Sequence, residues 1–144
     1  MARFFHSVDQ KGRVIVPVRV RNNLDGVLYV TPSLDEGYLS AYSSEQFQSI
    51  LDQLNQQSGT DPEFRQFRRD FLGIAQACEL DSQGRIGLST DLMELIGISP
   101  GDEICFIDMF GKVEICSKRF FDQEEAGKNT LSQMDLRRFD VKGL

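Results

Sequence analysis

One short sequence occurs twice in this chain, and the duplication constrains the fold more than any other feature. Asp9-Gln10-Lys11-Gly12-Arg13 recurs as Asp81-Ser82-Gln83-Gly84-Arg85, and the segments that follow also align, up to residues 47 and 121. Two copies are too few for a solenoid, so we interpret the chain as two small modules fused in tandem. A module of roughly 45 residues buries too little apolar surface to be stable alone. The two copies are therefore expected to share one core in a closed β structure.

Both copies predict the same order of elements, and the predicted class is mainly β with helices (α+β). A short strand enters the repeated loop, where Asp opens a turn and Gly supplies a left-handed position. A second strand, a short helix and two more strands follow. Pro17 and Ser89 or Thr90 are expected at the starts of the short helices. The predicted strands are Phe4–Val8, Arg13–Val16, Val27–Thr31 and Tyr38–Tyr42, then Ala75–Leu80, Arg85–Leu88, Glu103–Ile107 and Lys112–Cys116.

A polar, helical connector joins the copies. Ser43 with Gln46, and Thr60 with Glu63, have the spacing of capping boxes. The second helix has an aromatic face and an arginine face: Phe64, Phe67, Phe71 and Leu72 on one side, Arg65, Arg68 and Arg69 on the other. Core packing explains the phenylalanines most simply, and contact between protomers is the alternative. The arginines, balanced by nearby carboxylates, favour a solvated or subunit-contacting face over a DNA surface.

These segments predict four parts of the chain. They are a first module over 1–47, a helical connector over 48–74, a second module over 75–121 and a polar C-terminal tail over 122–144. From Asn129 the tail has apolar residues at loose helical spacing, which indicates a frayed helix.

Composition and charge exclude several classes of protein. Sixteen Lys and Arg against 22 Asp and Glu give a net charge of −6, which rules out a generally basic coat. One histidine and three cysteines without C-x-x-C spacing argue against a metal site or a disulfide scaffold, and favour free thiols in a reducing cytoplasm. No apolar run approaches the ~18 residues of a membrane span, and no signal-peptide stretch is present. The sequence predicts a soluble, cytoplasmic protein.

Catalytic machinery is also missing from the sequence. His6 and Ser7 are the one candidate base and nucleophile, but neighbours on a strand point to opposite faces. There is no P-loop or nucleotide-binding glycine pattern. We therefore expect no enzyme, no catalytic residues, no metal, no cofactor and no small-molecule substrate.

The cations of the first copy gather around its loop. Residues 1–47 hold five cations and five acids, whereas residues 75–121 hold four cations and eight acids. The second loop also replaces Lys11 with Gln83. A Lys-Gly-Arg loop can bind phosphate or guanine, because Arg offers a bidentate fork and Gly permits close approach. The alternative is a solvated turn in which Asp and Gly only fix the geometry.

The two loops resemble the paired motifs of the MraZ family, and the run Phe67-Arg68-Arg69-Asp70-Phe71-Leu72-Gly73-Ile74-Ala75 is similar to that family's middle segment. The resemblance extends to about residue 121. It implies two tandem SpoVT–AbrB-like modules that form one pseudo-dimeric, swapped-hairpin β barrel. One departure is the opening Arg3-Phe4-Phe5, where the family has Phe-Arg-Gly.

The resemblance also implies a function. Members of the family are transcriptional regulators that form ring-shaped homo-oligomers. They bind direct repeats of double-stranded DNA in the promoter of the division and cell-wall gene cluster, which includes their own gene, so a nucleoid-associated protein is expected. By position, Lys11 and Arg13 would contact DNA, with support from Arg3, Arg19 and Arg21. Two alternatives stay open: an antitoxin-like AbrB DNA binder, and a ring-forming protein-interaction module.

Overall fold

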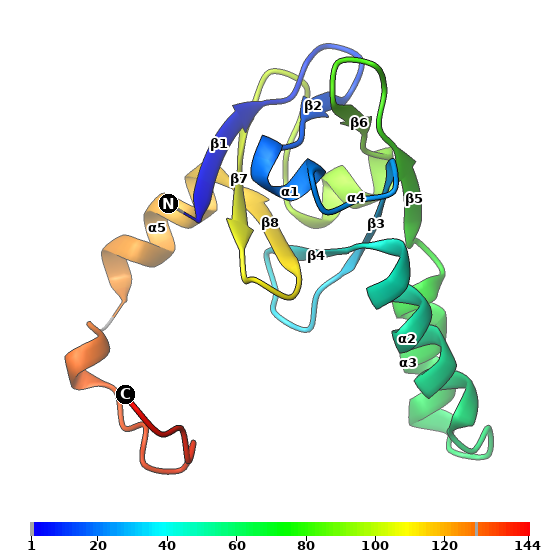
Figure 1. Ribbon diagram of the computed structural model, residues 1–144, viewed down its shortest axis with the longest axis vertical. Coiled ribbons are helices and arrows are strands. Elements are labelled where there is room, and N and C mark those ends of the chain that lie inside the picture. Colours follow the sequence, from blue (N-terminus) through cyan, green and yellow to red (C-terminus); the bar gives the residue numbers. More distant parts are fainter. Residues whose placement is uncertain (1, 129) are drawn as a thin grey trace.

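The structure, a computed structural model, describes residues 2–128 and 130–144 (Figure 1). It confirms the mixed α+β class. The first repeat holds β1 (Arg3–Ser7), β2 (Arg13–Ile15), α1 (Val18–Arg21), β3 (Val27–Pro32) and β4 (Tyr38–Tyr42). The connector holds α2 (Ser44–Gln56) and α3 (Pro62–Leu72). The second repeat holds β5 (Gln76–Glu79), β6 (Arg85–Gly87), α4 (Thr90–Leu95), β7 (Glu103–Asp108) and β8 (Val113–Ser117), followed by α5 (Lys118–Gly127) and a 3₁₀ turn, η1 (Leu131–Gln133).

The two repeats exchange strands. The large sheet has the order β1-β7-β8-β4-β3-β5, and β2 pairs with β6 in a separate ribbon; every pairing is antiparallel. The first strand of each repeat thus pairs with the third strand of the other, as β1 with β7 and β5 with β3. This order is unchanged when the two repeats are interchanged, so the fold has a pseudo-two-fold symmetry that relates β4 to β8 and β2 to β6.

The described strands do not close into the expected barrel. β1 and β5 lie at opposite edges of the six-stranded sheet and do not pair with each other. After each of these strands the chain turns into the repeated loop and enters the β2–β6 ribbon. The ribbon is extended by Val16 N–H donating to Gly84 O (2.9 Å) and Leu88 N–H donating to Gly12 O (3.0 Å). Hydrogen bonding at this end therefore joins the two loops to each other and leaves the large sheet open.

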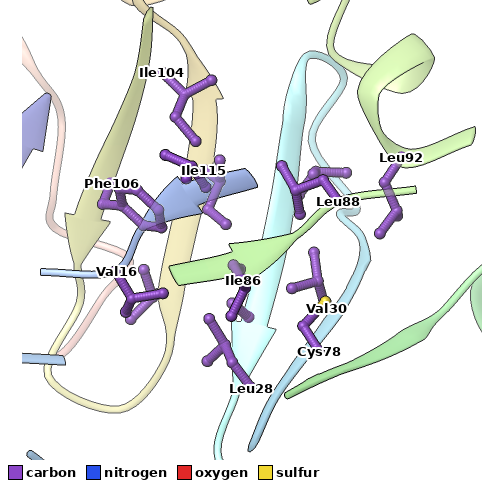
Figure 2. Close-up of a cluster of buried hydrophobic side chains, with 14 of the residues drawn as sticks. Val16, Leu28, Val30, Cys78, Ile86, Leu88, Leu92, Ile104, Phe106 and Ile115 are labelled. Carbon is purple, nitrogen blue, oxygen red and sulfur yellow. The ribbon is translucent and has the colours of Figure 1, made fainter. Parts of the chain in front are cut away.

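One hydrophobic core draws side chains from both repeats, as expected for modules too small to fold alone. In Figure 2, Val16, Leu28 and Val30 of the first repeat pack against Ile86, Leu92, Ile104, Phe106 and Ile115 of the second. Phe106 is the largest fully buried side chain. Fully burying a side chain of this size contributes about 1.5–3 kcal/mol, so neither half keeps its stability without the other.

The helix starts test the capping predictions. The Ser43 box is confirmed: Ser43 Oγ accepts from the Gln46 N–H, and the Gln46 side chain accepts from the Ser43 N–H. The Thr60 box is wrong, because the Asp61 carboxylate caps α3 by accepting from the N–H groups of residues 63 and 64. Thr60 instead hydrogen-bonds the Ser58 hydroxyl at 2.8 Å, and Pro62 takes the first helical position that suits a proline.

The aromatic face of α3 is only partly core. Phe71 is buried, while Phe64 and Phe67 are half-buried; the rings of Phe67 and Phe71 stack at 5.4 Å. On the other side, Arg68 donates to the Asn55 side chain of α2 (3.0 Å). α2 and α3 thus form a helical hairpin that projects from the sheet (Figure 1).

The C-terminal segment begins as a regular helix. Ser117 Oγ accepts from the Phe120 N–H and starts α5 as Ser43 starts α2. The predicted tail boundary at residue 122 falls inside α5. Asn129 lies outside the described residues, and beyond it the frayed helix reduces to the single turn η1.

Candidate nucleic-acid interface

The two repeated loops have the same internal hydrogen bonds. In the first, Asp9 Oδ1 accepts from the N–H groups of Lys11 and Arg13 (both 2.9 Å), and Asp9 Oδ2 accepts from Arg13 Nε (2.9 Å). In the second, the corresponding distances from Asp81 are 2.9, 2.9 and 2.8 Å. Gly12 and Gly84 both have φ of +77°. The repeated sequence therefore encodes one rigid loop, built twice.

These hydrogen bonds keep the aspartates ionised. The bond from the backbone N–H of Arg13 lowers the pKa of the Asp9 carboxyl, and the Arg13 guanidinium lowers it further. Arg85 acts in the same way on Asp81. The carboxylates thus hold their arginines in place at any pH above the ordinary range of an aspartate.

The β2–β6 ribbon holds the two loops side by side at one end of the molecule. Val14 faces Ile86 across the ribbon, and both are buried in the core. Figure 1 shows these loops at the top of the view, far from the α2–α3 hairpin and from the C-terminal segment. A long partner such as a DNA duplex can therefore reach both loops without contacting the α2–α3 hairpin or the C-terminal segment.

The two loops differ in the charge they display. The Lys11 side chain is exposed and has no partner among the described residues. Arg13 is 36% exposed and aimed by Asp9. Arg85 is only 22% exposed, because its Nη1 lies 3.8 Å from Asp9 Oδ2 and its Nε is held by Asp81. The cations of the first loop are thus more accessible to a ligand than Arg85 of the second.

Arg21 braces the second loop. Its Nε donates to Val16 O (2.7 Å), and its guanidinium packs directly against the backbone of Gly84. A Cβ added at Gly84 would clash with Arg21 Nη1. This contact between the repeats was not predicted, and its only signal in the sequence is that both loops keep a glycine.

Arg19 and Arg3 lie away from the loops. Arg19 approaches Asp108 (3.4 Å) and stacks on the Phe110 ring at 4.8 Å. Arg3 stands at the far end of β1, about 20 Å along the strand from the first loop, with its guanidinium over the Phe121 ring at 5.3 Å. Of the five predicted residues, the structure brings Lys11, Arg13 and Arg21 to the ribbon and leaves these two elsewhere.

Substituting the loop glycines provides a matched test of this geometry. Gly12→Ala should cost about 1–2 kcal/mol of unfolding free energy, since alanine is strained at positive φ; the nearest atom to its Cβ would be a tolerable 3.5 Å away. Gly84→Ala should cost at least about 1 kcal/mol more, because Arg21 loses its hydrogen bond. Urea unfolding at equal protein concentration measures both. In an Arg21→Ala background, Gly84→Ala should cost no more than Gly12→Ala, because the side chain that it displaces is gone. Equal costs of the two glycine substitutions in the parental protein would contradict the bracing contact.

Two grooves lie at opposite ends of the β4–β8 ladder and are equivalent under the pseudo-symmetry. The α1 groove, of about 390 Å³, is formed by α1, the β7–β8 turn and the start of α2, and includes Arg19, Asn23, Leu24, Gln46, Phe110 and Lys112. The α4 groove, of about 730 Å³, is formed by the end of α4, the β3–β4 turn and α5, and includes Asp35, Glu36, Leu95, Glu114, Phe120 and Glu124. The first groove carries two cations, Arg19 and Lys112, with the Asp108 carboxylate beside Arg19, whereas the second carries four carboxylates.

The turns beside these grooves display apolar side chains to solvent. Leu34 in the β3–β4 turn is 87% exposed and Phe110 in the β7–β8 turn is 74% exposed. Phe110 also has φ of +64°, a strained conformation for a bulky residue. Strain and exposed apolar surface together are typical of contact sites.

The fold and the loops together define the class of protein. It is a duplicated α+β protein whose two halves exchange strands and present a pair of Asp-x-x-Gly-Arg loops on one β-ribbon. A family model described as "MraZ protein, putative antitoxin-like" matches the chain twice, over residues 1–70 and 71–142. The chain belongs to the MraZ family.

Curated relatives carry the name "Transcriptional regulator MraZ". The protein of Lachnoclostridium phytofermentans is 36% identical over 94% of this chain and 89% of its own length. That of Thermoanaerobacter sp. strain X514 is 37% identical over 90% and 87%. A solution structure of PHS018 from Pyrococcus horikoshii aligns over 81% of this chain and 87% of its own, with 16% identity and a TM-score of 0.32.

No helix in residues 2–128 or 130–144 is long and apolar enough to cross a membrane. Over the same ranges, no three His, Cys, Asp or Glu side chains gather as metal ligands.

Proposed function

We propose that this chain is a sequence-specific DNA-binding transcriptional regulator in which Lys11 and Arg13 contact the DNA. The observation that carries the proposal is the geometry of the first loop. Lys11 is exposed there, and Asp9 holds the guanidinium of Arg13 in one orientation beside it. An arginine held in this way can form a bidentate contact with guanine or phosphate. In this proposal Arg21 braces the loops, and Arg3 and Arg19, which lie away from them, are supporting cations outside the loop contact. The names of the relatives support the same function.

We further propose that the chain assembles into a ring and binds direct repeats in the promoter of the division and cell-wall gene cluster, its own gene included, as a nucleoid-associated protein of the cytoplasm. A single acidic protomer of net charge −6 binds DNA poorly. A ring aligns several copies of the loop, so each further contact becomes intramolecular and gains effective concentration. DNA that repeats the same binding site at regular intervals matches such an array of loops.

The shapes and charges of the two grooves support one specific contact for this ring. In the arrangement we propose, the β3–β4 turn of one protomer, with exposed Leu34 and acidic Asp35 and Glu36, enters the α1 groove of the next, where Lys112 lies. The pseudo-symmetry then brings the β7–β8 turn of that neighbour, with Phe110, to the α4 groove of the first. Because the two surfaces differ, the contact is head-to-tail and closes into a ring when the rotation allows.

The strand exchange supports the finer description of the fold. We propose that each repeat is a SpoVT–AbrB-like swapped hairpin, that residues 1–47 and 75–121 are the two modules, and that residues 48–74 and 122–144 are additions to them. The pairing of β1 with β7 and of β5 with β3 is the feature behind this assignment.

The direct test is a gel shift of the gene's own upstream region with intact and Arg13-altered protein at several salt concentrations. Specific binding that weakens steeply with salt and depends on Arg13 supports the proposal. Weak binding, blind to sequence and to changes at residues 11 and 13, would favour a protein-interaction module instead. The description of the family model favours an antitoxin-like DNA binder as second candidate; that role requires an adjacent toxin gene.

Lys11 offers a quantitative prediction. Lys11→Gln, which copies the second loop, should weaken binding to all DNA sequences about equally. It should also reduce the slope of log Kd against log salt by about 0.9 for each loop that touches a phosphate. A fluorescence-anisotropy titration at four or more salt concentrations measures the slope. An unchanged slope would show that Lys11 neutralises no phosphate.

A further inference from the structure

Two of the three cysteines face each other across the β7–β8 hairpin. Cys105 and Cys116 are directly opposed in the strand register, and opposed residues project from the same face of a sheet. Cys105 Sγ donates to Phe106 O (3.9 Å), and the two thiols are close enough to shift each other's pKa. Directly opposed residues of an antiparallel pair have Cα atoms about 4.5–5.5 Å apart, which lies inside the range that a disulfide spans.

The pair lies outside the main core. Cys105 and Cys116 form a small separate cluster with Phe121, against which Tyr38, Ile107 and Phe120 pack. The thiols are fully buried, but what covers them is the first turns of one short helix, α5, on the outer side of the sheet. Opening of α5 alone would expose them, and such local opening costs less than global unfolding.

We propose that Cys105 and Cys116 form a redox-active dithiol that hydrogen peroxide converts into an intrachain disulfide when α5 opens. The Cys105 thiolate attacks one peroxide oxygen, giving a sulfenic acid and releasing hydroxide. The Cys116 sulfur then displaces the sulfenic hydroxyl and forms the S–S bond. In sum, two thiols and one peroxide give one disulfide and two waters, so the thiols lose the two electrons that the peroxide gains.

The environment favours Cys105 as the attacking sulfur. The interaction with the Cys116 thiol lowers the pKa of Cys105, and the positive charge of Arg3 lowers it further. The same pairing, together with burial, raises the pKa of Cys116. Arg3, which lies far from the first loop, thus stabilises the thiolate form of Cys105.

Cys78 is the internal control. It lies in the main core opposite Leu28, where burial raises its pKa to about 12 and no thiol faces it. It should stay reduced while the other two react.

The test is peroxide treatment of the folded protein, followed by alkylation in denaturant and intact-mass measurement. The protein should lose two of its three alkylatable thiols, the peptides holding residues 105 and 116 should be linked, and dithiothreitol should restore both thiols. The Cys78→Ser variant should lose both of its two alkylatable thiols, and Cys105→Ser or Cys116→Ser should form no intrachain link.

Phe121→Ala should accelerate the reaction several-fold, because it weakens the packing of α5 over the two thiols. Absence of the link in Phe121→Ala, or equal oxidation of Cys78, would overturn the proposal. None of these readouts depends on DNA binding.

Discussion

Arg13→Ala is expected to abolish binding to the promoter while leaving fold and assembly unchanged. The lost guanidinium removes one to two orders of magnitude of affinity per bidentate contact, and the loss is compounded over every loop of the ring that binds at once. The fold should survive, because Asp9 still accepts from the backbone N–H groups of residues 11 and 13. The ion pair that is lost is near the surface and contributes little to stability.

Two controls separate charge, geometry and loop identity in this experiment. Arg13→Lys keeps the charge but loses the fork and the Nε bond to Asp9, so it should retain non-specific binding and lose sequence preference. Gln83→Ala changes the position equivalent to Lys11 in the second loop and should leave the affinity nearly unaltered. Gel shifts give the affinities, and light scattering after size exclusion gives the assembled mass. Normal promoter binding by Arg13→Ala would refute the assignment of the reading residue, and a large loss in Gln83→Ala would make the second loop a reader.

Local structure could be predicted from the sequence because its determinants are local. Each of the eight predicted strands is present to within one residue. The repeated loops are one example, because an Asp-x-x-Gly turn closes on itself with hydrogen bonds between near neighbours. The same holds for the serine caps at Ser43 and Ser89. The error at Thr60 has a local cause too: two capping residues stand side by side, and Pro62 selects Asp61.

Long-range structure could not be predicted in this way. Nothing near Arg21 indicates that its side chain reaches Gly84 in the other repeat. Arg3 and Arg19 are close to the first loop along the chain, but β1 carries Arg3 to the far end of the sheet and α1 turns Arg19 towards Asp108. Nor does the repeat itself predict whether the sheet closes. The duplication required a shared core, and both an open and a closed sheet satisfy that requirement.

Lys112→Glu is expected to break the ring into smaller species. Lys112 lies in the α1 groove, where the proposed contact brings Asp35 and Glu36 of the next protomer. Placing like charges face to face across an interface costs several kcal/mol. Glu36→Lys should fail to assemble for the same reason, with the signs reversed. Combining the two changes restores opposite charges and should restore the assembled mass in light scattering or sedimentation.

The loss of assembly should carry over to DNA, because a lone protomer forfeits a multivalent gain of about 10²- to 10⁴-fold. Lys142→Glu makes the same charge change in the exposed C-terminal segment and should alter neither mass nor promoter binding. The double variant should recover both together. Because it also restores the net charge of −6, Lys142→Glu is the control that excludes a mere change in net charge. If the single variants keep the parental mass at every concentration, the contact lies elsewhere, and the half-buried phenylalanines of α3 become the next surface to change.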